Sequence, residues 1–130
     1  MSERWVEFQG GPCRAKKDEV RITLNKRGVL LLNRHAYEAF GQPAAVMLSY
    51  EENRRCIGVT PHDPRHTNAF PVKQKDKWHN RVIHITSFVR HWGIDIRRTV
   101  LFNEIDIDQK GMMRLELNRT ITIGKNGNGA

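Results

Sequence analysis

The chain has 130 residues, of which 38% are hydrophobic and 28% are charged, and its 22 Lys and Arg against 14 Asp and Glu give a net charge of +8. These figures exclude a mainly disordered chain, and they exclude a membrane-spanning helix because no apolar run approaches the ~18 residues that one needs. They indicate one domain that favours a polyanionic partner such as nucleic acid.

Residues 1–19 show no clear period and contain the sequence Gly10-Gly11-Pro12, so we expect a lead-in to the packed domain. The segment has neither the apolar core nor the small-residue cleavage site of a signal peptide. Cys13 and Cys56 match no metal-ligand spacing, and two scattered cysteines suit a reducing compartment. The sequence therefore predicts a cytoplasmic protein.

Residues 20–60 have the pattern of a strand, a turn, a second strand, a helix and a hairpin. Gly28 can take the positive φ that the turn needs, Asn33 can cap the helix, and Gly41 can end it. The expected elements are strands over 20–24 and 29–32, a turn over 25–28, a helix over 34–40, and hairpin strands over 46–50 and 56–59.

A polar linker over 61–69 leads into a second block, residues 70–118, with a similar order of elements. Thr86 or Ser87 is the expected cap of its helix, and Gly93 ends that helix. Residues 119–130 finish in a Gly/Asn run and are expected to form a flexible tail. The expected elements of the block are strands over 81–85, 100–107 and 113–117 and a helix over 88–92.

The two blocks align at an offset of 52 residues, which pairs Phe40-Gly41 with Trp92-Gly93 and also pairs Gly28 with Asn80. A unit of this size buries too little apolar surface alone, so the blocks must share one core. The sequence thus predicts a mainly β fold (α+β) with two short helices, built as a tandem repeat with pseudo-two-fold symmetry. Whether the repeat closes within one chain or needs a homo-oligomer is left open.

The unit resembles the swapped-hairpin fold of AbrB-like transcription regulators and of the MraZ family, which is also a tandem of two units. Gly28, the apolar strand over 29–32 and Phe40-Gly41 carry the resemblance in the first block, and Asn80-Arg81 and Trp92-Gly93 carry it in the second. The resemblance implies a swapped-hairpin β-barrel and contact of the loops with duplex DNA. The acidic residue usual at the start of that loop would be replaced by Asn25 and by Lys77.

The chain is also similar to a group of bacterial proteins of unassigned function. This likeness rests on the strand and acidic turn Tyr50-Glu51-Glu52-Asn53 and on the helix from Phe88 to Gly93-Ile94-Asp95. It covers more of the chain but implies no activity.

Basic residues gather in the two loops that precede the apolar strands. Lys supplies phosphate contacts and Arg can also contact guanine, whereas an ordinary solvated basic surface is the alternative interpretation. The predicted DNA-binding residues are Lys26, Arg27, Lys73, Lys75, Lys77 and Arg81.

Other motifs give weaker signals of chemistry. Glu104, Asp106 and Asp108 alternate on one strand and could bind Mg²⁺, while His62 and His66 have no partners that complete a zinc site. We therefore expect a non-catalytic transcription regulator with no cofactor, no metal and no membrane partner. The second hypothesis is a protein-interaction or assembly module without DNA binding, and the third is a metal-dependent nuclease.

Overall fold

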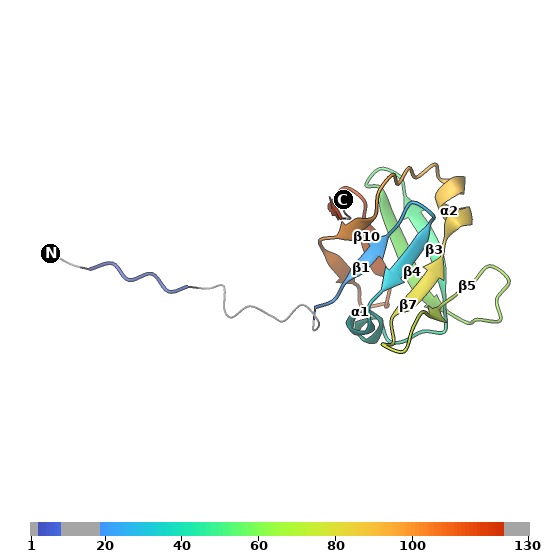
Figure 1. Ribbon diagram of the computed structural model, residues 1–130, viewed down its shortest axis with the longest axis horizontal. Coiled ribbons are helices and arrows are strands. Elements are labelled where there is room, and N and C mark those ends of the chain that lie inside the picture. The colour runs from blue at the N-terminus through green and yellow to red at the C-terminus, as the bar shows by residue number, and fades with distance from the viewer. Residues whose placement is uncertain (1–2, 9–18, 124–130) are drawn as a thin grey trace.

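The computed structural model describes residues 3–8 and 19–123. Residues 19–123 fold into two antiparallel sheets and two short helices (Figure 1). The predicted class, mainly β with two short helices, is confirmed. No helix in the described ranges is long and apolar enough to cross a bilayer.

Sheet A contains the two apolar strands that the sequence placed after the basic loops, and these strands, β2 and β7, pair with each other. Their register joins Val29 to His84 and Leu32 to Arg81. The sheet order is β11 (Thr120–Thr122), β8 (Val100–Phe102), β1 (Ile22–Leu24), β2 (Val29–Leu32), β7 (Arg81–His84) and β6 (Lys73–Gln74).

Sheet B is built around the long hairpin of β3 and β4. The strand β4 continues to His62, so the expected linker over 61–69 begins two residues too early. Pro61 cannot donate a backbone hydrogen bond, but it fits at this end of β4 because β10 pairs with β4 only as far as Val59. The sheet order is β5 (Phe70–Pro71), β3 (Ala45–Glu51), β4 (Cys56–His62), β10 (Met113–Glu116) and β9 (Ile105–Ile107).

The expected strand over 100–107 is two strands, because the chain leaves sheet A after Phe102 and enters sheet B at Ile105. The return segment divides in the same way into β10 and β11. Thr120–Thr122 pairs with β8, so the tail expected over 119–130 was placed too early. The rest of that tail, residues 124–130, lies outside the described residues, as does most of the expected lead-in over 1–19.

The helices α1 (Arg34–Ala39) and α2 (Thr86–His91) lie near opposite ends of the strands (Figure 1). Gly41 and Gly93 end them with φ of 95° and 64°, as predicted. The predicted caps differ: Asn33 caps α1, but neither Thr86 nor Ser87 caps α2. Thr86 is instead the first residue of α2, and its hydroxyl donates to a loop carbonyl.

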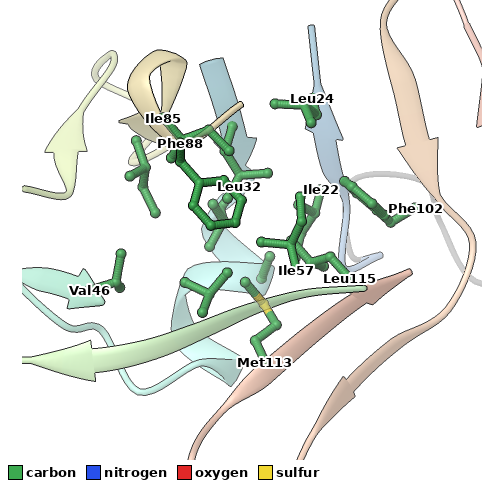
Figure 2. Packing of buried hydrophobic residues seen from close by; sticks show 14 of the residues in the cluster. Ile22, Leu24, Leu32, Val46, Ile57, Ile85, Phe88, Phe102, Met113 and Leu115 are labelled. Atoms are coloured by element: carbon green, nitrogen blue, oxygen red, sulfur yellow. The ribbon is translucent and has the colours of Figure 1, made fainter. Parts of the chain in front are cut away.

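The core lies between the facing sides of the two sheets, where Leu32, Ile22, Ile57 and Leu115 converge (Figure 2). All four side chains are fully buried. The helices contribute Ala36 and Phe88, and Phe40 follows α1 directly, whereas Trp92, just after α2, is 36% exposed. Both sequence blocks therefore share one core, as the small size of each block requires.

The resemblance implies a swapped-hairpin β-barrel, whereas the structure shows two antiparallel sheets. Neither sheet closes on itself among the strands of residues 19–123.

Replacing Asn33 by Ala should lower the free energy of unfolding by about 1–2 kcal/mol, since one side chain serves two segments. Its Oδ1 accepts from the Ala36 N–H at 2.9 Å and from the Arg21 N–H at 3.1 Å, and its Nδ2 donates to the Glu19 carbonyl. Urea unfolding followed by circular dichroism measures the change. The matched control is Asn103→Ala, because Asn103 is exposed, and equal losses in the two variants would contradict the capping role.

Candidate nucleic-acid interface

The first basic loop, residues 25–28, is a tight turn that presents Lys26 and Arg27 to solvent. The Asn25 side-chain oxygen accepts from the backbone N–H groups of Arg27 and Val29, both at 3.0 Å. Gly28 donates to the Asn25 carbonyl and has a φ of 80°. The turn is thus fixed by the Asn25 side chain and by backbone groups, which leaves both cationic side chains available.

This loop packs against the start of α2. The Thr86 hydroxyl donates to the Arg27 carbonyl at 2.8 Å, and the Ile85 N–H donates to the Gly28 carbonyl at 2.8 Å. A groove of 420 Å³ beside the contact is lined by Lys26, Arg27 and also Arg90 of α2, and its one carboxylate, Asp95, pairs with Arg97. The fold therefore adds a third cation, Arg90, to the first loop.

The second basic loop, residues 75–80, uses the same device with a carboxylate. The Asp76 carboxylate accepts from the N–H groups of Trp78 and Asn80 at 3.0 and 3.3 Å. Desolvation alone would raise the pKa of Asp76, but the hydrogen bonds from Asn80 and Trp78 lower it below its usual value. Asp76, and not Lys77, is therefore the residue equivalent to Asn25, which corrects our alignment of the loops.

The side chains of Lys73, Lys75 and Lys77 are exposed around this second loop. The Lys77 ammonium lies 5.1 Å from the centre of the Trp78 ring, and that ring is 66% exposed. A cation beside an exposed aromatic face can contact both a phosphate and an unpaired base.

Arg81 differs from the three lysines because it is half-buried and lies over the Tyr37 ring of α1, 4.5 Å from the ring centre. That contact holds its guanidinium at the start of β7, beside α1. A shallow pocket of 280 Å³ between α1 and this loop is lined by Arg34, His35 and Trp78. Arg34 is thus a second cation that the sequence analysis did not include.

The structure places the two basic loops at opposite ends of the β2–β7 pair, because the two strands run antiparallel. Given the ~3.3 Å rise per residue, the cations of one loop lie roughly 20 Å from those of the other. The predicted residues hence form two clusters: cluster one is Lys26 and Arg27 with Arg90, and cluster two is Lys73, Lys75, Lys77 and Arg81 with Arg34.

None of these cations forms an ion pair with a carboxylate of residues 3–8 or 19–123. Several other arginines do, including Arg65 with Asp63 at 2.8 Å and Arg97 with Asp95 at 3.2 Å. The cations of both clusters are therefore free to meet an external anion, as are the exposed Arg21, Arg54, Arg55, Arg98 and Lys110 elsewhere in the described ranges.

The acidic row is occupied by other contacts. Glu104 pairs with Arg119, and Asp108 accepts from the N–H groups of Lys110 and Met112 at the β9–β10 turn. The bond from Met112 is the main cause that lowers the pKa of Asp108. Asp106 remains, opposite Arg114 on β10, so the row does not form a three-carboxylate site.

His62 and His66 lie in edge contact, 4.8 Å between ring centres, but His66 Nδ1 accepts from the Asn68 N–H. No group of three His, Cys, Asp or Glu that could hold a metal occurs in the described ranges. Burial, and then Glu116, raise the pKa of the Cys56 thiol, which disfavours its thiolate. Cys13 lies outside the described residues.

In comparisons with protein-family models, curated proteins and solved structures, nothing matches the chain.

Proposed function

We propose that the protein is a non-catalytic, cytoplasmic DNA-binding regulator of AbrB-like type whose two basic clusters contact the backbone of duplex DNA. The observation that carries the proposal is the arrangement of the clusters. Equivalent loops hold Lys26 and Arg27 at one end of the β2–β7 pair and Lys75 and Lys77 at the other, with Lys73 on the adjoining strand β6. None of these residues forms an ion pair with a described carboxylate.

The strand pairing supports a tandem swapped-hairpin repeat as the scaffold for this function. The first strand of the first block, β1, pairs with β8 of the second block, and β5 of the second block pairs with β3 of the first. The helices Arg34–Ala39 and Thr86–His91 are offset by 52 residues. The same offset converts the Val29–His84 pair into the Arg81–Leu32 pair, as a pseudo-two-fold axis between β2 and β7 would.

A two-fold arrangement suits duplex DNA, whose strands are themselves related by two-fold symmetry. A separation of roughly 20 Å is comparable with the distance between backbones across a major groove ~12 Å wide, once the phosphates on each side are added. Lysines neutralise phosphates, and Arg27, exposed at the loop tip, is the side chain best placed for a base edge. Arg81 is held by Tyr37 and suits a fixed phosphate contact.

Duplex binding should depend on the two clusters and should weaken steeply with salt. Fluorescence anisotropy of labelled duplex DNA measures it for the unaltered chain, for Lys26→Ala/Arg27→Ala and for Lys73→Ala/Lys75→Ala/Lys77→Ala. Each phosphate contact contributes about −0.9 to the slope of log affinity against log salt. The slope of the triple variant should therefore be less steep by about 2–3, and its affinity should be lower by roughly tenfold or more. Arg81→Ala is measured separately because it also removes the contact with Tyr37.

The matched control is Arg65→Ala/Arg97→Ala, which removes two exposed cations that already hold carboxylates. Its slope and affinity should stay close to those of the unaltered chain. Equal loss in the control and in Lys26→Ala/Arg27→Ala would show only a general charge effect, and no binding at ~50 mM salt would refute the proposal.

One observation favours the second hypothesis, a protein-interaction or assembly module. The outward face of sheet A carries aliphatic side chains, including the exposed Ile121. The nuclease hypothesis is examined in the same assay by adding Mg²⁺ and following cleavage of the labelled duplex, with Asp106→Asn as its variant.

A further inference from the structure

A row of side chains crosses the outward face of sheet A, the face opposite the core. The strand registers join Ile121 to Leu101, Leu101 to Thr23, Thr23 to Leu31, Leu31 to Val82, and Val82 to Lys73. We call this set the outer row. Because facing residues of neighbouring strands point to one side of a sheet, its members form one continuous strip.

Apart from Thr23, which is 7% exposed, and the terminal Lys73, the outer row is apolar although it faces away from the core. Leu31, Val82 and Leu101 are half-buried, and Ile121 is 48% exposed. The helices do not cover it, because their buried residues Ala36 and Phe88 belong to the core cluster on the other face. A strip of this kind on a small protein is typical of an interaction surface.

A second unpartnered apolar surface lies in the N-terminal segment, residues 3–8, which we call the arm. Its Trp5, Val6 and Phe8 side chains are 88%, 87% and 82% exposed. The arm extends away from the domain of its own chain (Figure 1), and its one side-chain hydrogen bond there is internal, from Trp5 Nε1 to Glu3. These three side chains contribute nothing to the described fold.

We propose that the arm of one chain packs on the outer row of a second copy, so that two chains exchange arms reciprocally. The two surfaces match in length: six strands at ~4.8 Å spacing span roughly 24 Å, and six extended residues span roughly 20 Å. They also match in charge, because the arm carries Glu3 and Glu7 against one cation, Arg4, and the outer row ends at the exposed Lys73. This inference does not rest on DNA binding.

The area is sufficient for a stable pair of chains. A buried aromatic side chain covers roughly 150–250 Å². An extended arm turns Val6 and Phe8 to one side and Trp5 to the other, so two arms that pack through Val6 and Phe8 bury on the order of 600 Å² of arm surface. A comparable area of the two outer rows is covered at the same time. The sum reaches the range of roughly 1,200–2,000 Å² that is usual for specific interfaces.

Sedimentation equilibrium on the full chain tests the exchange. We expect a dimer, and we expect its dissociation constant to rise at least about a hundredfold in Trp5→Ser/Phe8→Ser and in Leu31→Lys, since each dimer contains every substitution twice. The control is Met47→Lys, a half-buried residue on the outward side of sheet B, which should remain dimeric. Circular dichroism establishes that each variant keeps its fold.

Mixing the two variants gives the sharper result. Trp5→Ser/Phe8→Ser retains an intact outer row, and Leu31→Lys retains an intact arm. Together they can complete one of the two exchanges, so the mixture should contain a heterodimer although each variant alone stays monomeric. A monomeric unaltered chain would overturn the proposal, whether Trp5 is then exposed or docked on its own domain. A dimer that persists in the arm variant, or no heterodimer in the mixture, would also overturn it.

Discussion

Gly28→Ala should lower the free energy of unfolding by about 3 kcal/mol, although the position lies in a loop. A methyl group there would sit 2.8 Å from the Thr86 Cα and 3.1 Å from the Thr86 backbone nitrogen. Backbone atoms of a helix cannot move aside cheaply, and overpacking of this kind costs about 1–3 kcal/mol. The φ of 80° adds strain of about 1–2 kcal/mol for a residue with a Cβ.

The matched control is Gly41→Ala, because Gly41 also has a positive φ, 95°, but a methyl group there would meet no atom within 4 Å. It should cost only the strain, about 1–2 kcal/mol. Urea unfolding of the two variants separates the close contact from the backbone conformation. Equal losses would show that the approach of the loop to Thr86 is unimportant. The larger loss in Gly28→Ala should come with weaker duplex binding, since the same loop carries Lys26 and Arg27.

Leu32→Ala should lower the free energy of unfolding by about 2–5 kcal/mol, the range found when a fully buried leucine is truncated. Leu32 is 0% exposed and lies on β2, between Ile22 of β1 and the β7 strand of the other sequence block. Because both blocks share this core, the variant should still unfold in a single transition that different spectroscopic probes report identically.

Leu31→Ala is the control, since Leu31 is the adjacent residue on the opposite face and is half-buried. Its loss should be about 1 kcal/mol or less, measured on the monomer at high dilution. Two separate transitions in Leu32→Ala, or equal losses for the two leucines, would contradict a core shared by both blocks.

Local signals in the sequence were sufficient to predict most strands, the presence of both helices and the glycines that end them. The turn at Gly28, the cap at Asn33 and the stop at Gly41 depend on contacts within a few residues, so local chemistry identifies them. The division of residues 100–107 between two sheets and the pairing of Thr120–Thr122 with β8 depend on distant partners. Nothing local marks those features.

The candidate site was predictable as residue types and not as an arrangement. The basic loops stand out in the sequence, but Arg34 and Arg90 join the clusters only because each loop packs near the helix of the other block. The sequence alignment set Lys77, and not Asp76, against Asn25, because the second loop is longer than the first. Its hydrogen bonds to Trp78 and Asn80 identify the equivalence with Asn25.

The pairing of β1 with β8 has a consequence for synthesis of the chain. Thr23 meets its partner Leu101 only after 78 further residues have been made, so the emerging N-terminal half cannot complete sheet A on the ribosome. The β5 strand is likewise needed before β3 has both its neighbours. Contacts between distant parts of a chain slow folding, and strand edges that wait for partners invite association with other chains. Folding of this protein is therefore expected to finish after release, as one late cooperative step that closes both halves together.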